Sequence, residues 1–373
     1  MNELGKFWLR VSEGRKLDEL WKQFHADART SYRLYAKDFD SAGEPSTGKG
    51  LHFLDVLGRL FWAVAEKLSP ARRVLLIAGI VLLFLPSSRV QWQDSGGNVQ
   101  VALFDGHVWG GVLILILLFL EVADRVVMKR DLQIAKEIQA WLLPSNPPSV
   151  PGMEIAFATR PANTVAGDFY DVFCRTSSDS ADRPYMFAIA DVAGKSIPAS
   201  LLMATFQASL KTLAGTTESL TELVGRMNAY ACTNSQQGRR FTTALIAEYD
   251  PVAQHMVYVN AGHNLPVVLR TSGAIERMEA GGIPLGVLED APYASGSLSL
   301  ASGDWVVLFT DGVVEAENIQ ELEYGEPRFL QALQANARVS AAQMLHLIMT
   351  DLDRFVGQAP QHDDVTLLIL KKT

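Results

Sequence analysis

The chain has 373 residues and a formal net charge of −8 at pH 7, a length that allows two or three structural units. The acidic surplus lies in residues 151–373, where 25 Asp and Glu residues face 15 Lys and Arg residues, and it argues against nucleic acid as a partner. Cys174 and Cys232 are too few for a disulfide framework, and no Cys/His spacing indicates a zinc site.

Residues 1–70 are charged and mixed in polarity, without the apolar segment of a secretory signal. Apolar residues recur there at helical spacing: Leu17, Leu20, Trp21 and Phe24. We therefore expect amphipathic helices, interrupted by a loop rich in Gly, Ser and Pro at residues 41–50. This region is expected to be cytoplasmic, and its role cannot be read from the sequence.

Two apolar runs, Val74–Leu85 and Val108–Leu120, follow this region. Each is shorter than the roughly 20 residues that span a bilayer. Basic residues flank the pair on both outer sides: Arg72, Arg73, Arg125, Lys129 and Arg130. The segment between the runs, Pro86–His107, holds Arg89 as its one basic residue. This asymmetry predicts a transmembrane helical hairpin over residues 71–128 with a short external loop.

The hairpin interpretation has further consequences and one rival. Within the loop, Val90–Trp92 and Val99–Phe104 flank a glycine pair and predict a small β-hairpin. A membrane hairpin would place the chain at the inner (cytoplasmic) membrane, with the C-terminal domain in the cytoplasm. The rival interpretation is a pair of apolar helices packed in a soluble core.

Residues 129–150 are expected to link the hairpin to the C-terminal domain. No Pro occurs from Val108 to Leu143, so one helix can run through the segment until Pro144 ends it. Four residues in its last part recur at steps of three and four: Leu132, Ala135, Ile138 and Leu142. Two interpretations stay open, a packed connecting helix and a dimerising coiled coil that transmits a state to the next domain.

Residues 151–373 alternate between short apolar runs and helical patterns. The predicted strands are Ile155–Ala158, Phe169–Phe173, Met186–Ala190, Thr243–Tyr249, Met256–Asn260, Val267–Leu269, Trp305–Phe309 and Val365–Leu370. The predicted helices are Pro198–Ala214, Leu220–Ser235 and Ala341–Val356. Helices of this size among several strands predict a layered α+β domain.

Four acidic motifs lie in this domain. They are Ala166–Asp171, Ala190–Lys195, Phe309–Gly312 and His362–Thr366. Three of them adjoin predicted buried strands, so their carboxylates are held on rigid elements. Converging carboxylates repel one another unless cations neutralise them. Ligands that are all oxygen suit a hard cation such as Mg²⁺ or Mn²⁺, and the motifs therefore predict a metal-dependent hydrolase.

The order of these motifs and their neighbours resembles the SpoIIE/RsbU branch of the PP2C-type (PPM) serine/threonine phosphatases. The matching stretches are Glu137–Pro144, Pro161–Phe173, Ala188–Ala204, Phe241–Asp250, Tyr258–Pro266, Gly281–Val287, Leu308–Glu315 and His362–Leu368. Each stretch alone is weak, but eight in the same order are specific. The resemblance implies a β-sandwich flanked by helices, with two Mn²⁺ or Mg²⁺ ions at one end.

The resemblance also implies the ligands of those ions. They are the carboxylates of Asp168, Asp191, Asp311 and Asp363 and the backbone carbonyl of Val192. Asp191 would bridge the two ions, and Asp311 and Asp363 would bind the second one. Asp364 would support the site without binding metal. Two ions that hold a bridging water can hydrolyse a phosphoester directly, so no covalent phosphoenzyme is expected.

Four neighbouring residues allow more than one interpretation. Asp171 is either a ligand or, more in keeping with its position, an orienting group. His263 either organises a turn or donates a proton, and His362 is interpreted as structural. Arg160 either binds substrate phosphate through its guanidinium fork or forms an exposed salt bridge.

Two residues depart from the family pattern. Ala166 stands where the family has the first Gly of a Gly-Gly-Asp motif, and the small side chain of Ala should cost little. Ser196 stands where Gly often follows the residue that matches Lys195. Because Ser196 precedes the predicted helix Pro198–Ala214, it is a candidate N-cap. It also lies in a loop that moves in this family when the enzyme switches on.

The sequence therefore predicts a membrane-tethered protein serine/threonine phosphatase that depends on Mn²⁺ or Mg²⁺. The resemblance points to a phosphoserine signalling protein as substrate, of the anti-sigma-factor-antagonist (STAS) type. A homodimer through the linker helix is a further expectation, whereas a nucleic-acid partner is not expected. The rival from another class is a non-catalytic, membrane-anchored regulatory module that binds a partner.

Overall fold

The computed structural model describes residues 61–62, 65–86, 88–93, 99–175, 184–234 and 240–373. The chain divides into two compact units, Met1–Val126 and Val127–Thr373. The amphipathic helices predicted before residue 61 lie outside the described residues.

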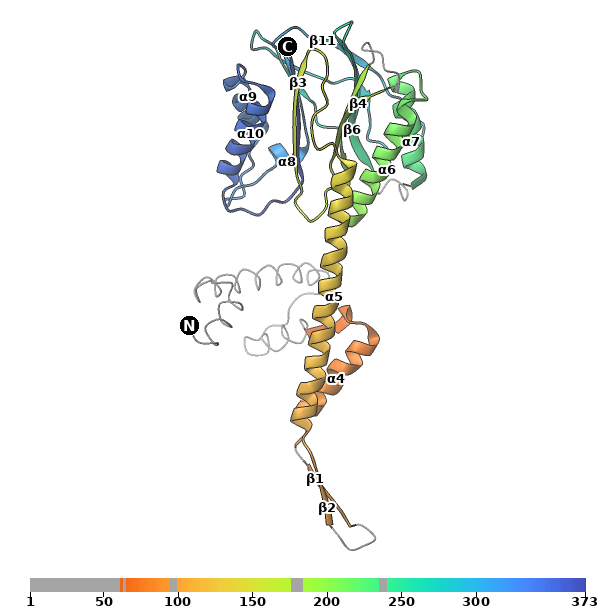
Figure 1. Ribbon diagram of the computed structural model, residues 1–373, viewed down its shortest axis with the longest axis vertical. Coiled ribbons are helices and arrows are strands. Elements are labelled where there is room, and N and C mark those ends of the chain that lie inside the picture. The colour runs from red at the N-terminus through yellow and green to blue at the C-terminus, as the bar shows by residue number, and fades with distance from the viewer. Residues whose placement is uncertain (1–60, 63–64, 87, 94–98, 176–183, 235–239) are drawn as a thin grey trace, which may run out of the picture. The chain divides into compact units, whose positions relative to one another are not determined.

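Among its described residues, the first unit contains helix α4 and the first part of helix α5, joined by a β-hairpin (Figure 1). Helix α4 (Pro70–Phe84) begins with a proline, which suits the first turn of a helix. Strands β1 (Ser88–Gln93) and β2 (Val99–Phe104) pair antiparallel, and helix α5 (Gly106–Leu142) follows. The two helices and the small β-hairpin between them are as predicted.

Helices α4 and α5 approach closely at two glycines. A Cβ added to Gly110 would lie 2.6 Å from the carbonyl oxygen of Gly79, so side chains there would force the helices apart. Toward the other end of α4, the Nη1 atom of Arg72 lies 2.7 Å from Asp124 and 3.2 Å from Glu121. Glu121 and Asp124 are therefore ion-pair partners of Arg72, one of the basic residues predicted to lie at a membrane boundary.

The predicted transmembrane hairpin over residues 71–128 is not supported. Among the described residues, no helix combines the length and the apolar character that crossing a membrane requires. Helix α4 has 15 residues, which gives about 22 Å at 1.5 Å per residue, against roughly 30 Å of hydrocarbon. The helical hairpin is thus confirmed, whereas its transmembrane assignment has no support among the described residues.

Helix α5 continues without a break to Leu142, two residues before Pro144, as predicted. In the last part of α5, Leu132, Ala135 and Leu142 are half-buried, whereas Ile138 is 47% exposed. The predicted seam is therefore not a single buried stripe in this chain. The dimerising role of the helix stays a prediction.

The second unit is a sandwich of two β-sheets between two layers of helices (Figure 1). One sheet has the order β3 (Met153–Arg160), β13 (Val365–Lys372), β12 (Trp305–Phe309), β8 (Val267–Leu269) and β9 (Ile275–Arg277). The other has the order β10 (Gly281–Gly282), β7 (His255–Ala261), β6 (Thr242–Asp250), β5 (Tyr185–Val192) and β4 (Phe169–Cys174), with β11 (Gly296–Ser299) beside β7. The helices are α6 (Ile197–Ala214), α7 (Leu220–Asn234), α8 (Asp311–Val314), α9 (Glu326–Ala335) and α10 (Ala341–Val356).

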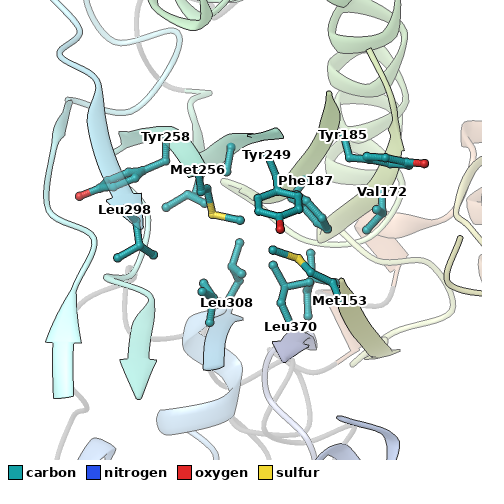
Figure 2. Close-up of a cluster of buried hydrophobic side chains, with 14 of the residues drawn as sticks. Met153, Val172, Tyr185, Phe187, Tyr249, Met256, Tyr258, Leu298, Leu308 and Leu370 are labelled. Atoms are coloured by element: carbon teal, nitrogen blue, oxygen red, sulfur yellow. The ribbon is translucent and has the colours of Figure 1, made fainter. Parts of the chain in front are cut away.

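The sandwich holds together through three apolar layers. The layer between the sheets contains Met153, Phe187, Leu308 and Leu370 among its members (Figure 2). The other two layers lie under α6 and α7 on one side and under α9 and α10 on the other. A strand between two apolar layers must turn successive side chains to opposite faces. Strand β5 does so, since Phe187 faces the opposite sheet and Met186 faces the helices.

The predicted α+β sandwich is confirmed in its main elements. All eight predicted strands and all three predicted helices are present within two residues of the expected bounds. Five further elements were not predicted, namely the short strands β9, β10 and β11 and the helices α8 and α9.

Asn228 on α7 holds the loop after β10 through side-chain hydrogen bonds, and substituting it tests how much these bonds stabilise the fold. Its side-chain amide is fully buried, donates to the carbonyls of Leu288 and Glu289 at 2.8 and 2.9 Å, and accepts from the amide of Gly286 at 3.0 Å. Asn228→Ala is expected to lower the free energy of unfolding by about 2–4 kcal/mol, because it leaves three backbone groups without a partner. Urea denaturation measures this loss. An unchanged midpoint would contradict the anchoring role.

Candidate metal centre

Asp168 and Asp191 lie opposite each other at the end of one sheet. Phe169 at the start of β4 pairs with Ala190 on β5, so the next residues along this register are Asp168 and Asp191. Asp168 is 2% exposed, and Asp191 is half-buried. Val192, the last residue of β5, is buried, and its carbonyl oxygen would lie 3.1 Å from a Cβ added to Gly167. One sheet therefore brings three of the predicted ligands together.

Asp311 and Asp363 come from the other sheet. Asp311 is the first residue of α8, directly after the Thr310 that follows β12, and Asp363 lies two residues before β13. The Thr310 hydroxyl donates to Oδ2 of Asp168 at 2.8 Å, and this buried hydrogen bond joins the two sheets at the site. The edges that carry all four aspartates therefore meet.

The carboxylates oppose one another electrostatically. Burial raises the pKa of Asp191 to about 7, with Asp311 and Asp363 adding to the increase and Lys195 opposing it. Burial and the neighbouring Asp191 carboxylate also hold the pKa of Asp168 well above its usual value. The pKa of Asp311 is raised by burial and by Asp363. This edge therefore carries more negative charge than its own residues neutralise.

Asp364 holds the loop that precedes Asp168. Its Oδ1 accepts a hydrogen bond from the amide of Ala162 at 2.7 Å, and its Oδ2 accepts one from the amide of Gly167 at 2.6 Å. Both carboxylate oxygens are therefore used by the backbone, which agrees with the supporting role predicted for Asp364 beside Asp363.

Lys195 is a cation that pairs directly with one of the predicted ligands. Its Nζ atom lies 2.9 Å from Oδ2 of Asp363 and donates to the carbonyl of His362 at 2.6 Å. The side chain is 55% exposed, so this ion pair is screened by water and contributes little to stability. Lys195 can change partner at low cost.

The donor set fits hard divalent cations in its chemistry. Four carboxylates and one backbone carbonyl offer only oxygen, which suits Mg²⁺ or Mn²⁺, and the raised pKa values show that their charges need neutralisation. Within the described part of the chain, however, no three His, Cys, Asp or Glu side chains are grouped closely enough to hold one ion. The ligands are gathered at one edge, and the side chains must turn to close on a cation.

Three further residues that were candidates from the sequence, Asp171, His362 and Arg160, contact other protein groups in the structure. Asp171 accepts from the amide of Val172 at 2.8 Å and pairs with Lys211 on α6 at 2.9 Å, which favours the orienting role. His362 is exposed, with its Nε2 atom 3.9 Å from Glu317. Arg160 pairs with Asp353 through both terminal nitrogens, at 2.5 and 3.2 Å, as the salt-bridge interpretation predicted.

His263 lies beneath the site. It is 5% exposed, and its Nδ1 atom lies 2.9 Å from the hydroxyl of Thr243, the residue that pairs with Asp191 across β5 and β6. Burial lowers its pKa to about 4, so the ring is neutral near pH 7. This position favours the structural role over the proton donor.

A cavity of about 360 Å³ opens beside the acidic edge. Arg160, Gly312, Glu315 and Asp363 are among the residues that line it. The cavity therefore connects one predicted metal ligand with the arginine that was considered for phosphate binding.

Ser196 has a strained backbone between the site and α6. Its φ of 66° and ψ of −144° belong to a region that glycine adopts easily. Ser196 occupies the N-cap position of α6 as predicted, but its side chain makes no capping hydrogen bond. The sequence thus predicted the N-cap position of Ser196 but not its positive φ.

Ser196→Gly is expected to raise the free energy of unfolding by about 1 kcal/mol, since relief of backbone strain outweighs the added freedom of the unfolded chain. Urea denaturation measures the gain. The matched control is Ser200→Gly inside α6, which should lose about 0.5–1 kcal/mol because glycine weakens a helix interior. Equal losses in both variants would contradict the strain at Ser196.

Solved structures share this architecture. The chain is similar to the SiaA-PP2C domain of Pseudomonas aeruginosa, with a TM-score of 0.57 and 21% identity, over 67% of this chain and 98% of that one. It is also similar to the PP2C phosphatase domain of SpoIIE from Bacillus subtilis, with a TM-score of 0.50 and 16% identity, over 59% and 63%. The β-sandwich flanked by helices is therefore the fold of PP2C domains.

Sequence comparison gives the family. The model for Stage II sporulation protein E (SpoIIE) matches residues 181–373, and the chain belongs to this family. The phosphoserine phosphatase RsbU of Bacillus subtilis is 28% identical over 66% of this chain and 71% of its own length. Protein IcfG of Synechocystis sp. is 25% identical over 66% of this chain, but the match spans only 42% of IcfG.

Proposed function

We propose that the chain is a protein serine/threonine phosphatase that hydrolyses phosphoserine or phosphothreonine with the help of two Mn²⁺ or Mg²⁺ ions. The observation that carries the proposal is the convergence of Asp168, Asp191, Asp311 and Asp363 at one edge, where burial and mutual repulsion raise the pKa of three of them. Membership of the SpoIIE family and the similarity to a phosphoserine phosphatase support it.

The four aspartates and the Val192 carbonyl would hold the ions, with Asp191 between them. When bound, divalent cations at such a site lower the pKa of a water and stabilise the charge on the phosphoryl oxygens. The Asp364 hydrogen bonds fix the loop before Asp168, and the Thr310 hydroxyl orients the Asp168 carboxylate. These contacts hold the ligand side chains on rigid elements.

Two cations of the chain, Lys195 and Arg160, are candidates to contact an incoming phosphate. Lys195 is paired with Asp363 and is half-exposed, so it can exchange that partner for a phosphate oxygen. Arg160 lines the neighbouring cavity, but both of its terminal nitrogens are engaged by Asp353. Lys195 is therefore the better placed of the two to neutralise an incoming phosphate.

We propose a phosphoserine signalling protein of the anti-sigma-factor-antagonist (STAS) type as substrate. The support is the resemblance of the catalytic domain to the SpoIIE/RsbU branch, together with the name of the relative RsbU, a phosphoserine phosphatase. The linker helix α5 offers a surface for a homodimer.

The test uses the purified full-length chain with a phosphoserine protein of this type and Mn²⁺. We expect release of inorganic phosphate that depends on Mn²⁺ and stops when EDTA removes the metal. Binding of Mn²⁺ is followed in parallel by calorimetry. Metal binding without phosphate release from any phosphoserine substrate would favour the rival, a regulatory module, and the absence of both would overturn the metal-dependent mechanism.

A further inference from the structure

The last part of α5 is joined to the loop before Asp168 by a two-point hydrogen bond. The Nε2 atom of Gln139 donates to the carbonyl of Ala166 at 2.8 Å, and the amide of Ala166 donates to Oε1 of Gln139 at 2.9 Å. Gln139 is 7% exposed and Ala166 is 0% exposed, so water does not compete for these bonds. The side-chain amide of Gln139 thus satisfies both backbone groups of one residue.

The residue held in this way lies two positions before a predicted metal ligand. The next amide, that of Gly167, donates to Asp364 at 2.6 Å, and the residue after it is Asp168. The loop is therefore fixed from two directions, by the carboxylate of Asp364 and by the amide of Gln139. A shift of the last part of α5 would pull on the backbone that positions the Asp168 carboxylate.

Other contacts already attach the end of α5 to the domain. Gln207 on α6 donates to the carbonyl of Leu142, and the Tyr170 hydroxyl donates to the carbonyl of Pro144 at 3.2 Å. Leu143 packs against the apolar layer under α6 and α7. Attachment of the helix end therefore does not depend on Gln139, which differs from these residues in contacting the Asp168 loop directly.

We propose that Gln139 is a positioning residue for the metal centre, through which the last part of α5 sets the Asp168 loop for cation binding. The inference rests on the proposed function, since it concerns the affinity of that centre for Mn²⁺ or Mg²⁺.

The experiment titrates Mn²⁺ into full-length protein by calorimetry. Gln139→Met keeps the length and bulk of the side chain and removes both hydrogen bonds, and it should weaken Mn²⁺ binding by about 10-fold, the usual cost of losing a residue that orients a ligand. Gln139→Glu keeps the acceptor for the Ala166 amide but sets a carboxylate oxygen against the Ala166 carbonyl, so it should lose at least as much Mn²⁺ affinity as Gln139→Met.

Two glutamines provide matched controls. Gln207→Met removes a contact between α5 and α6 without touching the Asp168 loop, and Gln133→Met changes a side chain on α5 whose amide donates to Glu137 on the same helix. Both should bind Mn²⁺ like the unaltered chain. An equal loss in Gln207→Met, or normal affinity in a folded Gln139→Met variant, would overturn the proposal.

Hydrogen exchange separates this inference from the proposed function. In the metal-free protein, the Ala166 amide should exchange faster in Gln139→Met than in the unaltered chain, whereas Gln207→Met should leave it unchanged. If the unaltered chain binds no Mn²⁺, the proposed function fails while the exchange data still report on the contact. If Gln139→Met does not fold, Gln139→Glu decides through the same two measurements, and unchanged exchange with unchanged affinity in that variant would overturn the proposal.

Discussion

Asp191→Asn is expected to lower the Mn²⁺-dependent turnover of a phosphoserine protein by more than about 100-fold. Losing a residue that merely orients a ligand typically costs 10- to 100-fold, and Asp191 is proposed as a ligand that both ions share. The measurement is phosphate release under saturating Mn²⁺. Asp250→Asn, which changes an exposed turn carboxylate that accepts from Val252 and Ala253, is the matched control and should keep full activity.

The same variant should be more stable than the unaltered chain when metal is absent. Because the pKa of Asp191 rises from 3.8 to about 7 on folding, the folded state binds its proton more tightly than the unfolded state. The contribution of Asp191 to stability is therefore complete below about pH 4 and is lost as the pH rises through about 7. Asparagine carries no such charge, so Asp191→Asn should gain on the order of 2 kcal/mol at pH 8.

Thermal unfolding in EDTA at pH 5 and pH 8 checks this second effect. The advantage of Asp191→Asn should be larger at pH 8 and should shrink at pH 5. Added Mn²⁺ should reverse the order, since cations that bind only the folded state stabilise the unaltered chain more. Equal stability of the two proteins at both pH values, with and without Mn²⁺, would show that the carboxylates do not converge as described.

The placement of three predicted ligands could be inferred from the sequence because these aspartates lie at or next to the ends of predicted strands. The buried runs before Asp191 and Asp311 and after Asp363 have the composition of strands, and they became β5, β12 and β13. A carboxylate at the end of a strand is fixed by the strand. Which sheet edges meet is a property of the whole topology, and only the resemblance to a known family supplied it.

The contacts that hold the site could not be read in the same way. Gln139 and Ala166 are separated by 27 positions, and nothing in either segment marks the pair of hydrogen bonds between them. The two bonds of Asp364 reach about 200 positions back to Ala162 and Gly167. Such contacts depend on loop conformation, and loops carry no hydrophobic period that a sequence reading can use.

The transmembrane prediction finds no support in the described residues, for a related reason. Arg72 was counted as a positive charge that marks a membrane boundary, yet it pairs with Asp124 and Glu121 across two helices. An apolar run of about a dozen residues is equally compatible with helices that pack together. The close approach of Gly79 and Gly110 was needed to show that α4 and α5 pack against each other.

Gly312→Ala is expected to damage the metal centre and the fold together. A Cβ added to Gly312 would lie 2.0 Å from the carbonyl oxygen of Asp364, 2.9 Å from its carbonyl carbon and 3.4 Å from that of Asp363. The obstacle is backbone and cannot rotate away, so α8 and the Asp363–Asp364 segment must separate. Because Asp311 begins α8, this separation moves two predicted ligands apart.

The expected result is a loss of about 1–3 kcal/mol in the free energy of unfolding, as for other overpacked buried sites, together with a strong loss of Mn²⁺ affinity. Urea denaturation and calorimetric Mn²⁺ titration measure the two effects. Gly225→Ala is the matched control, because α7 leaves open space around that glycine and alanine should stabilise the helix by about 0.5–1 kcal/mol. If Gly312→Ala loses stability but keeps its Mn²⁺ affinity, the damage to the fold does not reach the metal centre. That result would argue that Asp311 and Asp363 do not bind one ion together.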